Sequence, residues 1–180
     1  MNPKEILGYW FTEPVRSQWF KATPELDCEI RQRYHDLWLK ARDGGLEDWA
    51  GTPEGTIALV IVLDQFPLNM FRGQAEGFST EAASRDIAAG AIAAGFDRHL
   101  PDEQKAFLYL PFMHSEDLHD QDRSVELYEN PRLKENLRFA HHHRDIIRRF
   151  GRFPHRNQIL GRESTTKELA WLDSPEAFTG

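Results

Sequence analysis

The residues best suited to bind an anion come after the end of an expected helix. Gly151 and Pro154 are typical of a helix end and a stiff connection, and His155, Arg156 and Asn157 follow them directly. These three residues are expected at the start of the next helix, where unpaired backbone N–H groups and the helix dipole favour negative charge. Their side chains are directional donors for a phosphate or a carboxylate. The segment therefore predicts an anion site, and the alternative is that it pairs with an acidic helix elsewhere in the chain.

That acidic helix is expected to begin near a second group of ionisable residues, the sequence HSEDLH at positions 114–119. His114, Glu116, Asp117 and His119 lie close together there and are weak candidates for metal ligands. The spacing is no established metal signature, and an exposed acidic helix start is also favourable with the helix dipole. We therefore predict no metal and no other cofactor, and His114 and His155 remain candidates for an acid or base.

Asp64 is the third catalytic candidate because it directly follows the most apolar run of the chain, residues 57–63. A polar group at the end of a buried segment must find a partner. Asp64 either ties down the turn before Pro67 or orients an arginine or a histidine in a pocket. Arg72, which follows a few residues later, is a candidate to bind an anion in the same pocket.

The expected helix over residues 131–150 has two apolar stripes about 120° apart. Arg144 projects from the middle of one stripe, so it is paired, lines a polar cavity or reaches the surface along its aliphatic stem. The opposite and wetter side of this helix carries Arg138, His142, Asp145 and Arg149. His141–His143 fan out over about 200° on a helix, so the three rings do not bind one metal ion together.

Helices are the elements expected to position all of these side chains. Five times an Asn, Thr or Ser precedes a proline, at positions 2–3, 23–24, 52–53, 130–131 and 174–175, and each pair predicts a helix start. Residues 57–63 could form a buried strand by periodicity alone, but the Thr-Pro-Glu start favours a buried helix that Pro67 ends or kinks. We predict an all-α fold of seven to nine helices in antiparallel pairs, forming one compact domain over residues 1–180.

Composition limits the kind of protein and its partners. The chain has 180 residues, 40% of them hydrophobic, and one cysteine, which favours a reducing compartment. It shows no secretory signal and no apolar run long enough for a membrane helix, so we expect a cytoplasmic protein without a membrane partner. The net charge of −7 conceals a basic segment of +7 at residues 131–162 and −14 elsewhere. The negative total argues against a nucleic-acid partner.

Four motifs in this order resemble the bacterial domain-of-unknown-function family 924. They are YWF at residues 9–11, LDQFPLNMFRG at 63–73, LPFMHSED at 110–117 and RRFGRFPHRN at 148–157. The resemblance covers nearly the whole chain, and only Met113 departs from it, where a polar residue is expected. It implies an all-α fold of helical pairs similar to tetratricopeptide-repeat domains, and it implies no activity, substrate or catalytic residue.

We predict a polar pocket that binds an anionic small molecule or a chain terminus. The expected lining residues are Asp64, Arg72, His114, Glu116, Asp117, Arg144, His155, Arg156 and Asn157. Two alternatives stay open at this point. One is a tetratricopeptide-like module that binds a peptide in a concave groove, and the other is a hydrolase, with or without a metal, acting through the histidines and carboxylates.

Overall fold

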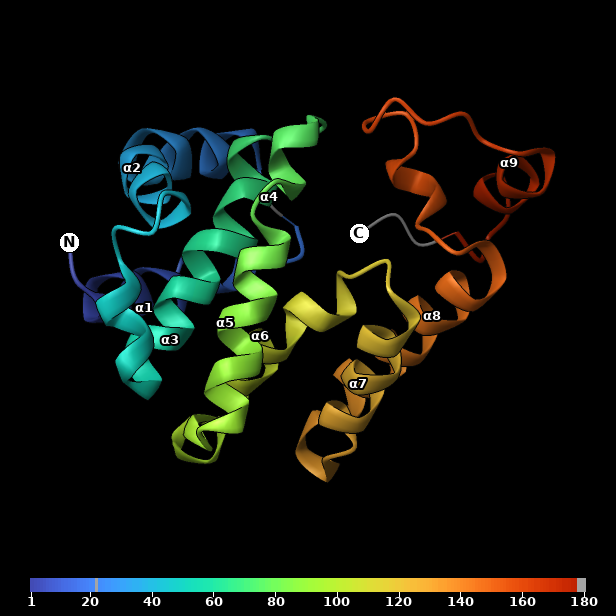
Figure 1. Ribbon diagram of the computed structural model, residues 1–180. Coiled ribbons are helices and arrows are strands. Elements are labelled where there is room, and N and C mark those ends of the chain that lie inside the picture. The colour runs from blue at the N-terminus through green and yellow to red at the C-terminus, as the bar shows by residue number, and fades with distance from the viewer. Residues whose placement is uncertain (22, 178–180) are drawn as a thin grey trace. The chain divides into compact units, whose positions relative to one another are not determined.

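The computed structural model describes residues 1–21 and 23–177, and this part of the chain contains helices and no strand (Figure 1). The predicted all-α fold is therefore confirmed. The α-helices are α1 (Pro3–Trp10), α2 (Pro24–Arg42), α3 (Pro53–Val60), α4 (Phe66–Met70), α5 (Glu81–Ala93), α6 (Asp102–Met113), α7 (Leu118–Tyr128), α8 (Lys134–Phe150) and α9 (Thr166–Leu172). None of these helices is long and apolar enough to cross a lipid bilayer.

Four of the five predicted Pro-preceded helix starts are confirmed by capping hydrogen bonds. The side chains of Asn2, Thr23 and Thr52 accept backbone N–H groups at the starts of α1, α2 and α3, and Asn130 does the same for the 3-10 turn before α8. The fifth prediction is wrong, because residues 175–176 form a turn and residue 177 is not helical. The Ser174 hydroxyl instead donates to the carbonyl of Trp171 at 2.6 Å, so it closes the end of α9.

The chain divides into two compact units, which are described separately. The first contains residues 1–72 and 76–111, and the second contains residues 73–75 and 112–177 of the described chain. The prediction that residues 1–180 form one domain stays a prediction.

In the first unit, α3 contains the first part of the all-apolar run at residues 57–63 and is surrounded by other helices, as that run predicts. It packs against α1 and α5, and α2 packs against α4 (Figure 1). The side chains of residues 57–63 are 0–3% exposed. Tyr34 of α2 stacks on Phe66 of α4 with ring centroids 4.6 Å apart, and Trp10 of α1 meets the edge of the same Phe66 ring. Apolar and aromatic burial therefore accounts for the core of this unit.

Pro67 does not end the helical segment, because the chain stays helical through it to Met70, and the alternative of a kink at Pro67 stays a prediction. A π-helical turn at Ile61–Gln65 joins α3 to α4. A proline ring clashes with the carbonyl four residues earlier, here that of Leu63, and the wider π turn relieves the clash. The displaced Leu63 carbonyl accepts a hydrogen bond from Thr80 at 2.5 Å, and Thr80 in turn accepts one from the Trp38 indole at 3.2 Å.

The second unit is built on the antiparallel pair α7 and α8, which lie side by side (Figure 1). Asp122 of α7 pairs with Arg148 at 2.9 Å and with Arg144 at 3.6 Å, so the acidic helix faces the basic one. Gly151 then ends α8 in the left-handed conformation at φ 71°. This turn brings Phe153 and Trp171 onto a small core with Ile146 and Ile147 of α8.

Candidate functional site

Glu116 anchors the long turn between α8 and α9. Its carboxylate accepts two hydrogen bonds from Arg162, at 2.6 and 2.9 Å, and one from the backbone N–H of Phe153 at 2.7 Å. Burial alone would raise the pKa of Glu116, but these donors outweigh it and lower the pKa below its ordinary value. The carboxylate is therefore charged and already occupied by the protein's own groups.

Asn157 and a second ion pair complete the same turn. Asn157 accepts a hydrogen bond from Arg162 at 3.0 Å and donates one to Ser164 at 3.0 Å. Arg152 donates two hydrogen bonds, of 2.7 and 2.9 Å, to the buried carboxylate of Glu168. These bonds lower the pKa of Glu168 to about 2. Two of the predicted lining residues, Glu116 and Asn157, thus hold the turn in place.

The helix start predicted at His155 to Asn157 is wrong. The structure has only a three-residue 3-10 turn, Pro154–Arg156, with Asn157 at its end. A turn this short aligns too few peptide dipoles to attract an anion as a helix N-terminus does. The physical argument for an anion site at this position therefore fails, although the side chains remain polar.

Two histidines, His143 and His155, lie near Phe153 and are neutral at pH 7. The Phe153 ring lies 5.6 Å from both His143 and His155, between ring centroids. Burial lowers the pKa of His143 to about 3, and burial together with the charge of Arg156 lowers that of His155 to about 4. His143 Nδ1 is 2.8 Å from the carbonyl of Phe139, and since a carbonyl only accepts, that nitrogen carries the proton.

Two of the predicted residues belong to the first unit. Asp64 is 0% exposed within the π turn and accepts a hydrogen bond from Gln65 at 2.6 Å. Arg72 donates to Asp27 of α2 at 2.6 and 3.0 Å, and Asn69 donates to the same carboxylate at 2.8 Å. Arg72 therefore joins α4 to α2. The meeting of all nine predicted residues in one cavity stays a prediction.

The carboxylates and histidines near α7 form one small exposed group. In the described chain, the atoms that come within 4.8 Å of one another as possible metal ligands belong to Asp117, His119 and Asp120. Asp117 also caps α7 by accepting the backbone N–H groups of His119 and Asp120, at 2.8 and 3.2 Å. The group thus has the ordinary task of a helix N-cap, and His114 is not part of it.

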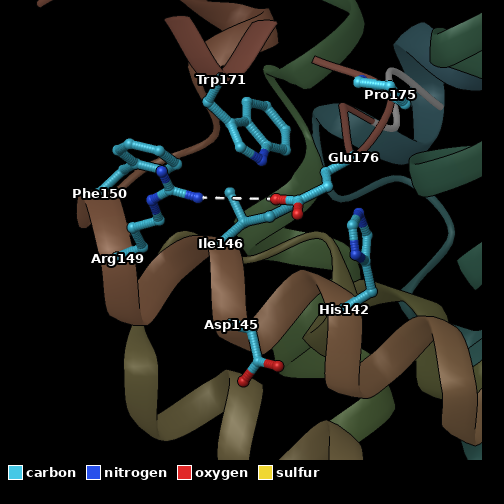
Figure 2. A pocket seen from close by; sticks show the side chains of 8 residues that line it. All are labelled: His142, Asp145, Ile146, Arg149, Phe150, Trp171, Pro175 and Glu176. Carbon is cyan, nitrogen blue, oxygen red and sulfur yellow. Dashed lines mark ion pairs between the residues drawn. The ribbon is translucent and has the colours of Figure 1, made fainter. Parts of the chain in front are cut away.

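A pocket of about 440 Å³ opens between α8 and the segment after α9. It is lined by His142, Asp145, Ile146, Arg149, Phe150, Trp171, Pro175 and Glu176. Figure 2 shows Arg149 and Glu176 reaching toward each other across it, 3.8 Å apart, with the Trp171 indole nitrogen turned into the pocket. The Arg149 guanidinium also lies 4.9 Å from the centroid of Phe150. The pocket thus joins one accessible cation to an aromatic wall.

Comparisons with known proteins agree with the fold and the motifs. The family model described as "Bacterial protein of unknown function (DUF924)" matches residues 6–176. The chain belongs to the DUF924 family. A solved structure of a protein of unknown function, ATU0120 from Agrobacterium tumefaciens, is 38% identical, with a TM-score of 0.90 over 95% of this chain and 96% of that one. Among curated proteins, none matches the chain.

In this DUF924 chain the pocket differs from the one expected from sequence. The α8 side of the lining was visible, since His142, Asp145 and Arg149 fall on the wetter side of that helix. Trp171 and Glu176 were not predicted, because no spacing of residues in the sequence indicates which side chains after α8 return to it. The left-handed turn at Gly151 brings them there, and only the tertiary structure shows where that turn leads.

Proposed function

We propose that the second unit binds a small carboxylate-bearing molecule in the α8–α9 pocket, with Arg149 as the anion-binding group. The observation that carries this proposal is the Arg149–Glu176 contact across the pocket (Figure 2). A carboxylate already lies 3.8 Å from the guanidinium, and both side chains are well exposed, at 56% and 75%. Exposed ion pairs contribute about 0–1 kcal/mol, so a ligand carboxylate can displace Glu176.

The rest of the lining supports an organic acid over a bare inorganic anion. A planar guanidinium binds both oxygens of a carboxylate, and the Trp171 N–H is a neutral donor directed into the same space. Phe150 and Trp171, whose ring centroids are 5.6 Å apart, form an aromatic wall above the buried Ile146. A volume of about 440 Å³ is in the range of small-molecule pockets. It suits a small ligand better than the peptide helix of an interaction module.

Isothermal titration with acetate, benzoate, 3-phenylpropanoate and inorganic phosphate tests the proposal. We expect the aromatic carboxylates to bind more tightly than acetate or phosphate. Arg149→Met should weaken their binding at least tenfold, because methionine keeps the aliphatic part of the side chain and removes the guanidinium group.

Arg138→Met is the matched control. Arg138 lies on the same helix, pairs with Glu135 at 3.9 Å and lies over Phe139 as Arg149 lies over Phe150. Binding should survive this change. Equal binding by the Arg149→Met and unaltered proteins, or no binding of any carboxylate at millimolar concentration, would contradict the proposal.

A further inference from the structure

We infer that the ligand of this pocket is a zwitterion, a free α-amino acid with an apolar side chain. This inference rests on the proposed function, because it takes Arg149 as the group that binds the ligand carboxylate. It adds a second requirement, a positive charge on the same small molecule.

The charges of the lining lead to that requirement. Arg149 is the cation of the lining, and Asp145 and Glu176 are its two carboxylates. When a ligand carboxylate binds Arg149, Glu176 no longer pairs with the guanidinium that lies 3.8 Å from it. A ligand that carries only negative charge would then place its own carboxylate beside that of Glu176 with a single guanidinium, since Asp145 points away from this space (Figure 2). Like charges at such distances repel, and the repulsion disfavours a simple anion.

An α-ammonium group removes this conflict. Figure 2 shows Arg149 and Glu176 on opposite sides of the pocket, so their charges are arranged as a pair facing inward. A ligand with a carboxylate and an ammonium on one carbon presents the opposite pair. Its carboxylate lies on Arg149, and its ammonium takes the place of the guanidinium beside Glu176. Arg149 and Glu176 then each keep an opposite partner.

The apolar side chain follows from the remaining wall. Ile146 and Trp171 are each 4% exposed, and Phe150 packs against the same core. An aliphatic or aromatic side chain covers the exposed part of this wall, and removing that apolar area from water favours binding. Glycine supplies both charges but nothing to cover the wall, so it should bind more weakly than phenylalanine or leucine.

Isothermal titration with L-phenylalanine, 3-phenylpropanoate and phenethylamine separates the two charges. The second compound lacks the ammonium group and the third lacks the carboxylate. We expect L-phenylalanine to bind at least tenfold more tightly than either. If 3-phenylpropanoate binds as tightly as L-phenylalanine, the zwitterion is wrong and the carboxylate site stands. If phenethylamine binds most tightly, or if none of the three binds, both proposals are overturned.

The Glu176→Gln substitution should change the affinities for two ligands in opposite directions. Because it removes the partner of the ammonium, it should weaken L-phenylalanine binding at least tenfold. Because it also removes the internal competitor for Arg149, it should strengthen 3-phenylpropanoate binding. Asp173→Asn, an exposed acid three residues away, is the control and should change neither affinity. Equal changes for both ligands in Glu176→Gln would overturn the inference.

Discussion

Glu116 and Glu176 each face an arginine, but their surroundings give them different roles. Glu116 accepts three hydrogen bonds from groups of its own turn, at 2.6 to 2.9 Å, and it is largely shielded from water. Glu176 is 75% exposed and lies 3.8 Å from one nitrogen of Arg149. A fully bonded carboxylate stabilises the fold, while a loosely held one leaves its partner accessible. This difference, not the residue type, separates the structural turn from the candidate site.

Replacing Glu116 should therefore destabilise the second unit. Glu116→Gln keeps the shape but removes the charge that three donors share, at a cost of about 2 kcal/mol. Urea unfolding at pH 7 measures the change. Glu126→Gln, which breaks an exposed pair with Arg123, is the control and should stay within about 0.5 kcal/mol. Equal effects of the two substitutions would contradict the structural role of Glu116.

Two half-buried histidines predict how stability depends on pH. His143 and His155 have pKa values of about 3 and about 4 in the folded protein, against the ordinary 6.5. As the pH falls from 6.5 toward 4, the unfolded chain takes up protons that the folded protein does not. The free energy of unfolding should then fall by up to about 1.4 kcal/mol per pH unit for each histidine.

Urea unfolding at pH 5, 6 and 7 measures this slope. His155→Gln should reduce it, because one of the two groups no longer takes up a proton on unfolding. His119→Gln replaces an exposed histidine of the same unit and should leave the slope unchanged. If the unaltered protein and both variants show the same dependence of unfolding free energy on pH, the burial of His155 does not control its proton binding.

The types of the site residues could be predicted from the sequence, but their arrangement in space could not. Glu116 and Asn157 were expected to line a pocket, with pairing inside the protein as the alternative, and both are hydrogen-bonded to Arg162. His155 was expected at a helix start, because Gly151 and Pro154 indicate a helix end and a stiff connection directly before it. No local sequence signal indicates that the chain makes only one 3-10 turn there. Hydrogen bonds to Arg162, which is distant from Glu116 in the chain, decide that geometry.

At the scale of elements, the helix starts were predictable because their signals are local. A capping side chain and the proline after it act within three residues, and Asn2, Thr23 and Thr52 all behave as expected. The π turn before Pro67 was not predictable in this way. It depends on Thr80, which takes the displaced carbonyl of Leu63 from a distant part of the chain.

Thr80→Val tests this account of the π turn. Valine has the same shape but cannot hydrogen-bond, so the buried Leu63 carbonyl and the Trp38 N–H both lose their partner. We expect a loss of about 2–3 kcal/mol in thermal or urea unfolding. Ser79→Ala, at the exposed neighbouring position, should cost less than about 0.5 kcal/mol. A Thr80→Val protein as stable as the unaltered one would show that the hydroxyl does not support the turn.

At the scale of the whole molecule, charge and tryptophan are unevenly distributed between the two units. The basic segment at residues 131–162 lies in the second unit and finds partners there in Asp122, Glu116 and Glu168. Four of the five tryptophans lie in the first unit, and Trp171 alone lies in the second. The residue that reports on the pocket is therefore the one tryptophan of its unit.

The indole N–H signals in a ¹H–¹⁵N NMR spectrum test the central claim most directly, with Trp171→Phe identifying the signal of the pocket. During titration with L-phenylalanine and then 3-phenylpropanoate, the Trp171 signal should move with both ligands, further at a given concentration with the amino acid. The other four indole signals should stay in place. Arg149→Met should abolish both responses. A Trp171 signal that moves with neither ligand, or that moves equally without Arg149, would contradict a carboxylate-binding pocket at this site.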